Sequence, residues 1–171
     1  MAKKNRIGPV IDCACVIHST LYSWDYVERL YNMVSRNLSA EVKFHVFTEP
    51  DRVVPEPMIK HSLVEWPNIA GPRKAWWYKM QLFNTQHHLG PLLYFDLDTV
   101  IVKDVSWITE LPPEKLWTIR DFRHLQNEHW SGMNSSVMWW SVPAFDWLWK
   151  KFIENDLTKT NDLSYLFHGS D

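Results

Sequence analysis

The stretch LLYFDLDTVIVKDV, residues 92–105, places Asp96 and Asp98 directly after a run of apolar residues. Residues 91–95, PLLYF, are apolar at every position, which is typical of a central strand covered on both faces. In an open α/β sheet, ligands bind beyond the carboxyl ends of the strands. We therefore predict a buried strand over 91–95 and a ligand site at the two aspartates that follow it.

Alternating strand and helix patterns before this stretch indicate an α/β fold. Residues 10–19, VIDCACVIHS, predict a buried strand, and Ser23 is placed to cap a helix. Residues 42–50, VKFHVFTEP, alternate between apolar and polar side chains and predict a strand that ends at Pro50. The helix between them has an apolar stripe at Val27, Leu30, Tyr31 and Val34. A strand, a helix and a strand in this order predict a parallel sheet.

The remaining patterns extend this sheet and its helices. Residues 61–66 predict a third strand, and residues 71–90 predict a helix punctuated by Pro72 and Gly90. Two later strands and a final helix are predicted over residues 116–122, 134–141 and 141–156.

The composition is that of one globular domain without an excess of basic charge. At 171 residues the chain is long enough to bury a real core, and we expect a single domain over residues 1–171. The net charge of −2 argues against a nucleic-acid-binding protein, because basic residues are neither in excess nor gathered on one face.

The N-terminal residues resemble a signal peptide, since a basic head precedes an apolar run. Asp12 interrupts that run, no small-residue cleavage site follows, and the run is far shorter than the roughly 20 residues that span a bilayer. We therefore expect a cytoplasmic protein without a transmembrane segment. Cys13 and Cys15 lie two positions apart, on one face of the predicted strand, and we interpret them as buried, reduced core residues.

Asp96 and Asp98 are the residues with the clearest predicted chemistry. Residues two apart on a strand point to the same side, about 6.6 Å apart, so both carboxylates can reach one cation. Carboxylate oxygens favour Mg²⁺ or Mn²⁺, which often take only one or two protein carboxylates and complete their shell with water and substrate phosphates. A cation there neutralises a departing diphosphate and so favours cleavage of the bond to it. The spacing alone fits an ordinary acidic turn after a core strand equally well.

Four segments of the chain together carry a family resemblance. They are the first strand and helix at 13–38, GPRKAWWYKMQLFN at 71–84, LLYFDLDTVIVKDVSWI at 92–108 and HWSGMNSSVMWWSVPAF at 129–145. In this order they resemble the nucleotide-sugar-dependent glycosyltransferases of the GT-A fold, particularly the glycogenin-like family eight. The resemblance implies a mostly parallel central sheet flanked by helices. It also implies a metal-dependent enzyme that moves a sugar from a nucleoside diphosphate, UDP above all, with retention of configuration. The acceptor, whether carbohydrate, lipid or protein, is not indicated.

The same resemblance gives roles to individual residues. Asp96 and Asp98 would hold Mn²⁺, or Mg²⁺, and through it the diphosphate of the UDP-sugar, with Asp96 also near the ribose. Asn134 matches the family asparagine that contacts the donor sugar, although a turn at the start of a strand also explains it. The residues placed near the base, the ribose and the phosphates are Thr20, Tyr22, Arg73, Lys74 and Lys79. A surface turn explains the first two equally well, and we expect one of the three basic residues to contact the donor.

Two departures from the family pattern bear on activity. The family glycine after Asn-Ser is Ser136 here, which is expected to reshape the donor-sugar site. The sequence ends at FHGSD, where the family continues through a DQ segment into a region with a histidine metal ligand and a lid. We therefore expect the C-terminal part of the family fold to be missing. Asp171 matches the first acid of that segment and is a candidate catalytic residue, and His168 is a candidate substitute ligand.

Two alternatives stay open at this point. A nucleotide-sugar-binding domain without catalytic activity is consistent with a missing C-terminal part. YFDLDTVIV, residues 94–102, also resembles the nucleophile motif of the haloacid dehalogenase phosphatases, in which Asp96 would attack phosphate. That motif is expected near the start of its domain, whereas 95 residues precede Asp96 here.

Overall fold

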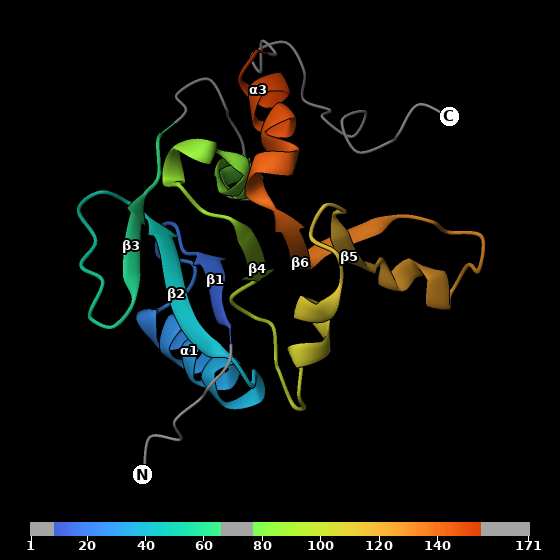
Figure 1. The fold of residues 1–171 in the computed structure, drawn as a ribbon, viewed down its shortest axis with the longest axis horizontal. Helices are drawn as coiled ribbons and strands as arrows, with labels where there is room; N and C mark the ends of the chain where they lie inside the picture. Colours follow the sequence, from blue (N-terminus) through green and yellow to red (C-terminus); the bar gives the residue numbers. More distant parts are fainter. Residues whose placement is uncertain (1–8, 66–76, 155–171) are drawn as a thin grey trace.

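The computed structural model describes residues 9–65 and 77–154, which form one sheet with helices on both faces (Figure 1). The strands are β1 (Val10–Val16), β2 (Glu41–Thr48), β3 (Ile59–Ser62), β4 (Pro91–Phe95), β5 (Trp117–Arg120) and β6 (Met133–Ser141). The α-helices are α1 (Trp24–Asn37) and α3 (Asp146–Glu154). Short 3₁₀ helices are η1 (Tyr78–Phe83), η2 (Thr85–His87), η3 (Ser106–Glu110), η4 (Phe122–Leu125) and η5 (Val142–Phe145).

The strand order in the sheet is β3-β2-β1-β4-β6-β5. β1 pairs in parallel with both β2 and β4, and β2 pairs in parallel with β3. β6 runs antiparallel to β4 and β5. The predicted α/β class and mostly parallel sheet are confirmed. Because β1 and β4 are adjacent and parallel, their carboxyl ends meet at the same edge of the sheet.

Both faces of the central strands are buried, which explains why β4 is apolar at every position. Alternate residues of β4 point to opposite faces, so Leu93 and Phe95 pack on the side of α1 while Leu92 and Tyr94 pack on the other. On the α1 side, the helix buries the stripe residues Val27, Leu30 and Val34. The opposite face is covered by η1 and α3, whose buried side chains include Tyr78, Leu82 and Phe152. The predicted stripe and the predicted central strand are both confirmed.

Several predicted boundaries differ from the structure. The described part of the expected helix at 71–90 is not one α-helix but the two short 3₁₀ helices η1 and η2, separated by Asn84 in an extended conformation with φ −79° and ψ 114°. The Asn84 side chain accepts a hydrogen bond from the backbone N–H of Gln86, so it caps η2 instead of continuing η1. Residues 66–76 lie outside the described residues.

The third strand begins earlier and ends earlier than predicted. β3 runs over Ile59–Ser62 because its register against β2 places Ile59 opposite His45 and Ser62 opposite Thr48, where β2 ends. Ser23 does occupy the N-cap position of α1 with an extended backbone, but its side chain makes no capping hydrogen bond within the described residues. The last predicted helix starts as η5, and α3 proper begins at Asp146.

Cys13 and Cys15 are buried on the α1 side of β1 and are free thiols, as predicted. Burial raises the pKa of both thiols well above the ordinary value, with a further contribution from Asp12 at Cys13. The thiolate, which is the nucleophile and metal ligand, is therefore not formed at these positions near neutral pH. In residues 9–65 and 77–154, no helix has both the length and the apolar character needed to cross a bilayer.

Candidate functional site

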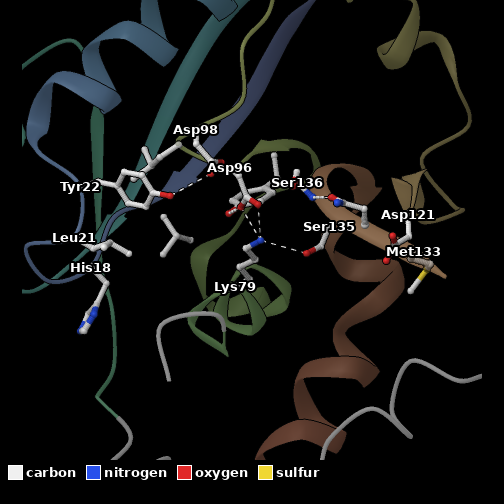
Figure 2. Close-up of a pocket in the computed structure, with 14 residues that line it drawn as sticks. His18, Leu21, Tyr22, Lys79, Asp96, Asp98, Asp121, Met133, Ser135 and Ser136 are labelled. Carbon is white, nitrogen blue, oxygen red and sulfur yellow. Dashed lines mark hydrogen bonds and ion pairs between the residues drawn. The ribbon is translucent and has the colours of Figure 1, made fainter. Parts of the chain in front are cut away.

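A pocket of about 570 Å³ opens where β1, β4 and β6 come together (Figure 2). Its polar lining comes from the loop after β1, from η1, from the end of β4 and from the start of β6. The principal polar side chains are those of Tyr22, Lys79, Asp96, Asp98, Asn134 and Ser135. The pocket therefore lies at the carboxyl edge of β1 and β4, where α/β sheets bind ligands.

Asp96 is held from several directions. The Lys79 ammonium lies 2.6 Å from Asp96 Oδ1 and 2.9 Å from Oδ2, and the Tyr94 hydroxyl donates to Oδ1 at 2.5 Å. The Asp96 backbone N–H donates to the carbonyl of Ser136 on β6 at 2.8 Å. Burial raises the pKa of Tyr94 well above its ordinary value, and the neighbouring Asp96 carboxylate adds to that shift. Tyr94 is thus a stable hydrogen-bond donor that orients Asp96.

Asp98 is exposed and has a different partner. Tyr22 donates its hydroxyl to Asp98 Oδ2 at 3.2 Å, across 76 positions of sequence. The Tyr22 ring packs edge-on against Tyr26 at 4.9 Å between centroids. Burial and the Asp98 carboxylate raise the pKa of Tyr22, so its hydroxyl remains protonated at neutral pH. Asp98 can rotate toward a ligand because it is exposed, whereas Asp96 is already oriented by Lys79 and Tyr94.

The two aspartates do not lie on the strand itself, which corrects one step of the sequence argument. β4 ends at Phe95, and Asp96 opens a turn closed by a hydrogen bond from the N–H of Thr99 to the carbonyl of Asp96 at 3.0 Å. The spacing of alternate strand residues therefore does not set the distance between the carboxylates. Both side chains still line the same pocket.

Asn134 and Ser135 form the β6 side of the pocket. Asn134 Oδ1 accepts the backbone N–H of Ser136 at 2.8 Å, so part of its polar capacity is used within the strand start. Ser135 Oγ lies 3.2 Å from the Lys79 ammonium, which therefore bridges β6 and the turn after β4. Figure 2 shows Lys79 pointing between Asp96 and Ser135.

The structure brings together some of the predicted site residues and not others. Tyr22, Lys79, Asp96, Asp98 and Asn134 all line the pocket. Thr20 is exposed in the turn after β1 and is not among the residues that line this pocket in the described part of the chain. Arg73, Lys74, His168 and Asp171 lie outside the described residues.

Sequence reasoning missed His18, Tyr94 and Asp121, which also line the pocket. The His18 ring stacks on Tyr78 with centroids 4.3 Å apart, and its Nε2 lies 3.2 Å from Glu65 Oε1. Its Nδ1 is buried without a hydrogen-bond partner among the described residues. His18 lies two residues after the end of β1, beside the same pocket as Asp96, and a histidine just beyond a buried strand is a position that could have flagged it. Tyr94 lies inside an apolar run and has no such signal.

The donor set fits a hard divalent cation that keeps several non-protein ligands. Within the described residues no group of three or more His, Cys, Asp or Glu side chains is arranged for a metal ion. Two carboxylates from Asp96 and Asp98 are nevertheless on one pocket wall. Mg²⁺ and Mn²⁺ take oxygen ligands and commonly complete their shell with water and phosphate oxygens. Lys79 forms an ion pair with Asp96 at the same place.

Comparison with solved structures gives the same architecture at very low sequence identity. An LgtC active-site mutant, Q189E, matches with a TM-score of 0.58 and 13% identity, over 92% of this chain and 70% of that one. GlyE of Streptococcus pneumoniae TIGR4, a glycosyltransferase, matches with a TM-score of 0.59 and 12% identity, over 85% of this chain and 38% of GlyE. The bifunctional glycosyltransferase WbbM matches with a TM-score of 0.60 and 10% identity, over 92% of this chain and 37% of WbbM. The fold is that of the GT-A glycosyltransferases.

No protein-family model matches the sequence, and no curated protein matches it either. The structural likeness therefore establishes the fold, and the glycogenin-like family in particular is not established. The chain spans 70% of the length of LgtC, 38% of GlyE and 37% of WbbM.

Proposed function

We propose that this chain transfers a sugar from a nucleoside diphosphate, UDP, to an acceptor, in a reaction that depends on Mn²⁺ or Mg²⁺. The observation that supports the proposal is the position of Asp96, Asp98 and Lys79 at the carboxyl edge of β4, lining one pocket of a GT-A fold. These groups carry the proposal because a fold alone does not specify an activity. A cytoplasmic location and retention of configuration remain predictions from the sequence.

The proposed roles follow from charge and position. Asp96 and Asp98 would hold the divalent cation, which when bound supplies positive charge to the diphosphate leaving group. Lys79 presents an ammonium on the same wall, 2.6 Å from Asp96, and can shift from the carboxylate to a phosphate or sugar oxygen. Tyr22 and Leu21 line the end of the pocket formed by the loop after β1, where the base and ribose of the donor would lie.

Asn134 and Ser135 offer neutral polar groups on the β6 side of the pocket. Such groups can hydrogen-bond sugar hydroxyls, and a site built to pair with a hydroxyl rejects analogues that lack it. Ser136 stands where the family that the sequence resembles has a glycine. Its backbone carbonyl accepts a hydrogen bond from the Asp96 N–H. We propose that the donor sugar lies against this strand start.

The first test is the effect of UDP on thermal stability with and without Mn²⁺. A ligand that binds only the native state raises the melting temperature by mass action. UDP with Mn²⁺ is expected to raise it by several degrees, and UDP alone by much less. Asp98→Asn should remove the Mn²⁺-dependent part, whereas Asp51→Asn, in the exposed turn after β2, should not. An Mn²⁺ effect that survives in Asp98→Asn would refute the metal assignment.

The second test separates transfer from binding. Release of UDP from UDP-glucose or UDP-galactose would support an enzyme, whereas UDP binding without turnover would support the binding-domain alternative. The phosphatase alternative is less well supported, because the acidic motif follows β4 rather than the first strand and the fold is GT-A. It would be favoured only by hydrolysis of p-nitrophenyl phosphate with a phosphoryl group trapped on Asp96.

A further inference from the structure

The loop between β1 and α1 contains a residue in an unfavourable conformation. Ser19 has φ 60°, in the left-handed region that a residue with a Cβ adopts at a cost. Such a conformation persists only where surrounding contacts impose it. Ser19 is exposed, so core packing does not impose it.

Both backbone polar groups of Ser19 are bound by one ion pair from the segment after β2. The Ser19 N–H donates to Glu49 Oε1, and Arg52 Nη2 donates to the Ser19 carbonyl at 2.8 Å. Arg52 Nε also donates to Glu49 Oε2 at 3.0 Å, which joins the two side chains. Thr48 Oγ1 donates to the same Glu49 oxygen at 2.8 Å and anchors it to the end of β2.

This ion pair is partly shielded from water and stays charged over a wide pH range. The side chains of Glu49 and Arg52 are 19% and 26% exposed. Burial by itself would raise the pKa of Glu49, but hydrogen bonds from Arg52, from backbone N–H groups including that of Ser19, and from Thr48 outweigh it and lower the pKa to about 2. The carboxylate is therefore available as an acceptor for Ser19 at neutral pH.

The residues on either side of Ser19 line the pocket. His18 precedes it, and Leu21 and Tyr22 follow it. Tyr22 also donates to Asp98, so the direction of this loop affects one of the two acidic groups. Glu49 and Arg52 themselves are not among the residues that line this pocket. Their influence on it passes through the backbone of Ser19.

We propose that Glu49 and Arg52 are positioning residues that hold Ser19 in its left-handed conformation and thereby orient Leu21 and Tyr22 toward the nucleoside of the donor. The choice of a nucleoside diphosphate as ligand rests on the proposed function above. The placement of the loop by the ion pair does not rest on the proposed function, because it follows from the contacts of Ser19 with Glu49 and Arg52.

Arg52→Ala tests the proposal against a matched variant of the same segment. Lys60→Ala is the control, since the Lys60 ammonium binds the carbonyl of Pro50 at 2.5 Å, whereas the backbone groups of Ser19 are bound by Glu49 and Arg52. With Mn²⁺ present, Arg52→Ala should weaken UDP binding about tenfold and raise KM for the donor, with kcat changed less than about twofold. Lys60→Ala should leave UDP affinity within about twofold of the wild type. Equal losses in the two variants would show a merely structural role and overturn the proposal.

Hydrogen exchange at the Ser19 amide decides the matter without any ligand. Because that N–H is bound to Glu49, both Arg52→Ala and Glu49→Gln should speed its exchange, while Lys60→Ala should not. Unchanged exchange in Arg52→Ala would overturn the proposal. If the wild type fails to bind UDP while the exchange behaves as expected, the proposed function fails and the placement of the loop stands.

A rescue variant separates conformation from charge. Glycine adopts positive φ without the Cβ penalty, so Ser19→Gly in the Arg52→Ala background should recover part of the lost UDP affinity. A double variant that binds UDP no better than Arg52→Ala would contradict the conformational role of the pair.

Discussion

The body of β4 and the turn that follows it are adjacent in sequence and opposite in character. Leu92 to Phe95 are at most 1% exposed and contact apolar side chains on both faces of the sheet. One residue later, Asp96 forms an ion pair with Lys79 of η1 and accepts a hydrogen bond from the Tyr94 hydroxyl of β4. Asp98 accepts a hydrogen bond from the hydroxyl of Tyr22, in the loop after β1. Burial of apolar surface stabilises the first region, whereas charge and hydrogen bonding organise the second.

Because the two regions are held by different interactions, stability and ligand binding should be separable by mutation. The apolar positions contribute through area removed from water, which is lost with any truncation. The polar positions are partly exposed, so their pairwise contacts add little to the free energy of unfolding. A substitution in one region should therefore leave the property of the other nearly unchanged.

The largest expected effect is on stability. Leu93→Ala removes a fully buried side chain between β1, β6 and α1, and should lower the free energy of unfolding by about 2–5 kcal/mol. Urea denaturation would measure it, with Val102→Ala, at a position 79% exposed, as the control expected to stay within about 0.5 kcal/mol of the wild type. UDP affinity of the folded fraction should be unchanged. A loss of UDP affinity in Leu93→Ala as large as that in Asp98→Asn would contradict the separation of stability from ligand binding.

An intermediate effect is expected at Lys79. Lys79→Met removes the ammonium that occupies Asp96, so Mn²⁺ alone should bind about threefold more tightly while UDP binds about fivefold more weakly. The unfolding free energy should change by no more than about 1 kcal/mol. Isothermal titration calorimetry measures both affinities, and Lys103→Met, at an exposed position, is the matched control. Weaker binding of Mn²⁺ in Lys79→Met would contradict competition between the ammonium and the cation.

A further prediction concerns a pH dependence away from the pocket. His61 contacts His45 Nδ1 at 2.9 Å, and burial, followed by the neighbouring His45 and His87, lowers its pKa from 6.5 to about 4, against an opposing effect of Asp12. Between pH 6.5 and about pH 4, the unfolded chain therefore binds more protons than the folded chain. The free energy of unfolding should fall as the pH falls through this range.

Unfolding by urea at several pH values would measure this dependence. His61→Asn should reduce the acid-induced loss of stability, whereas His129→Asn, at an 88% exposed side chain, should not. A wild-type unfolding free energy that is constant between pH 7 and pH 4.5 would contradict the prediction.

Much of the sheet could be predicted from local patterns. The apolar run at 91–95, the stripe of α1 and the strand at 10–19 are signals contained within short segments, and the structure confirms each element. The expected helix at 71–90 was wrong in its described part, because Asn84 uses its side chain to cap a new turn. Composition and periodicity do not reveal whether an asparagine faces solvent or binds its own backbone.

The candidate site could be predicted only in part. Asp96, Asp98 and Asn134 were identified from motif order, and Tyr22 and Lys79 from their positions in the resembling segments. Tyr94, the donor to Asp96, could not be distinguished from an ordinary core aromatic. Glu49 and Arg52 gave no signal, since their role depends on a backbone carbonyl and N–H elsewhere in the chain.

Local sequence patterns were enough to predict the strands of the sheet and the place where apolar residues give way to acidic ones, because both are properties of neighbouring residues. Which groups meet at that place depends on how the strands pair. Lys79 binds Asp96 across 17 positions, Ser19 binds Glu49 across 30, and Tyr22 binds Asp98 across 76. Such contacts follow from strand pairing, which brings the ends of β1, β2 and β4 to one edge of the sheet.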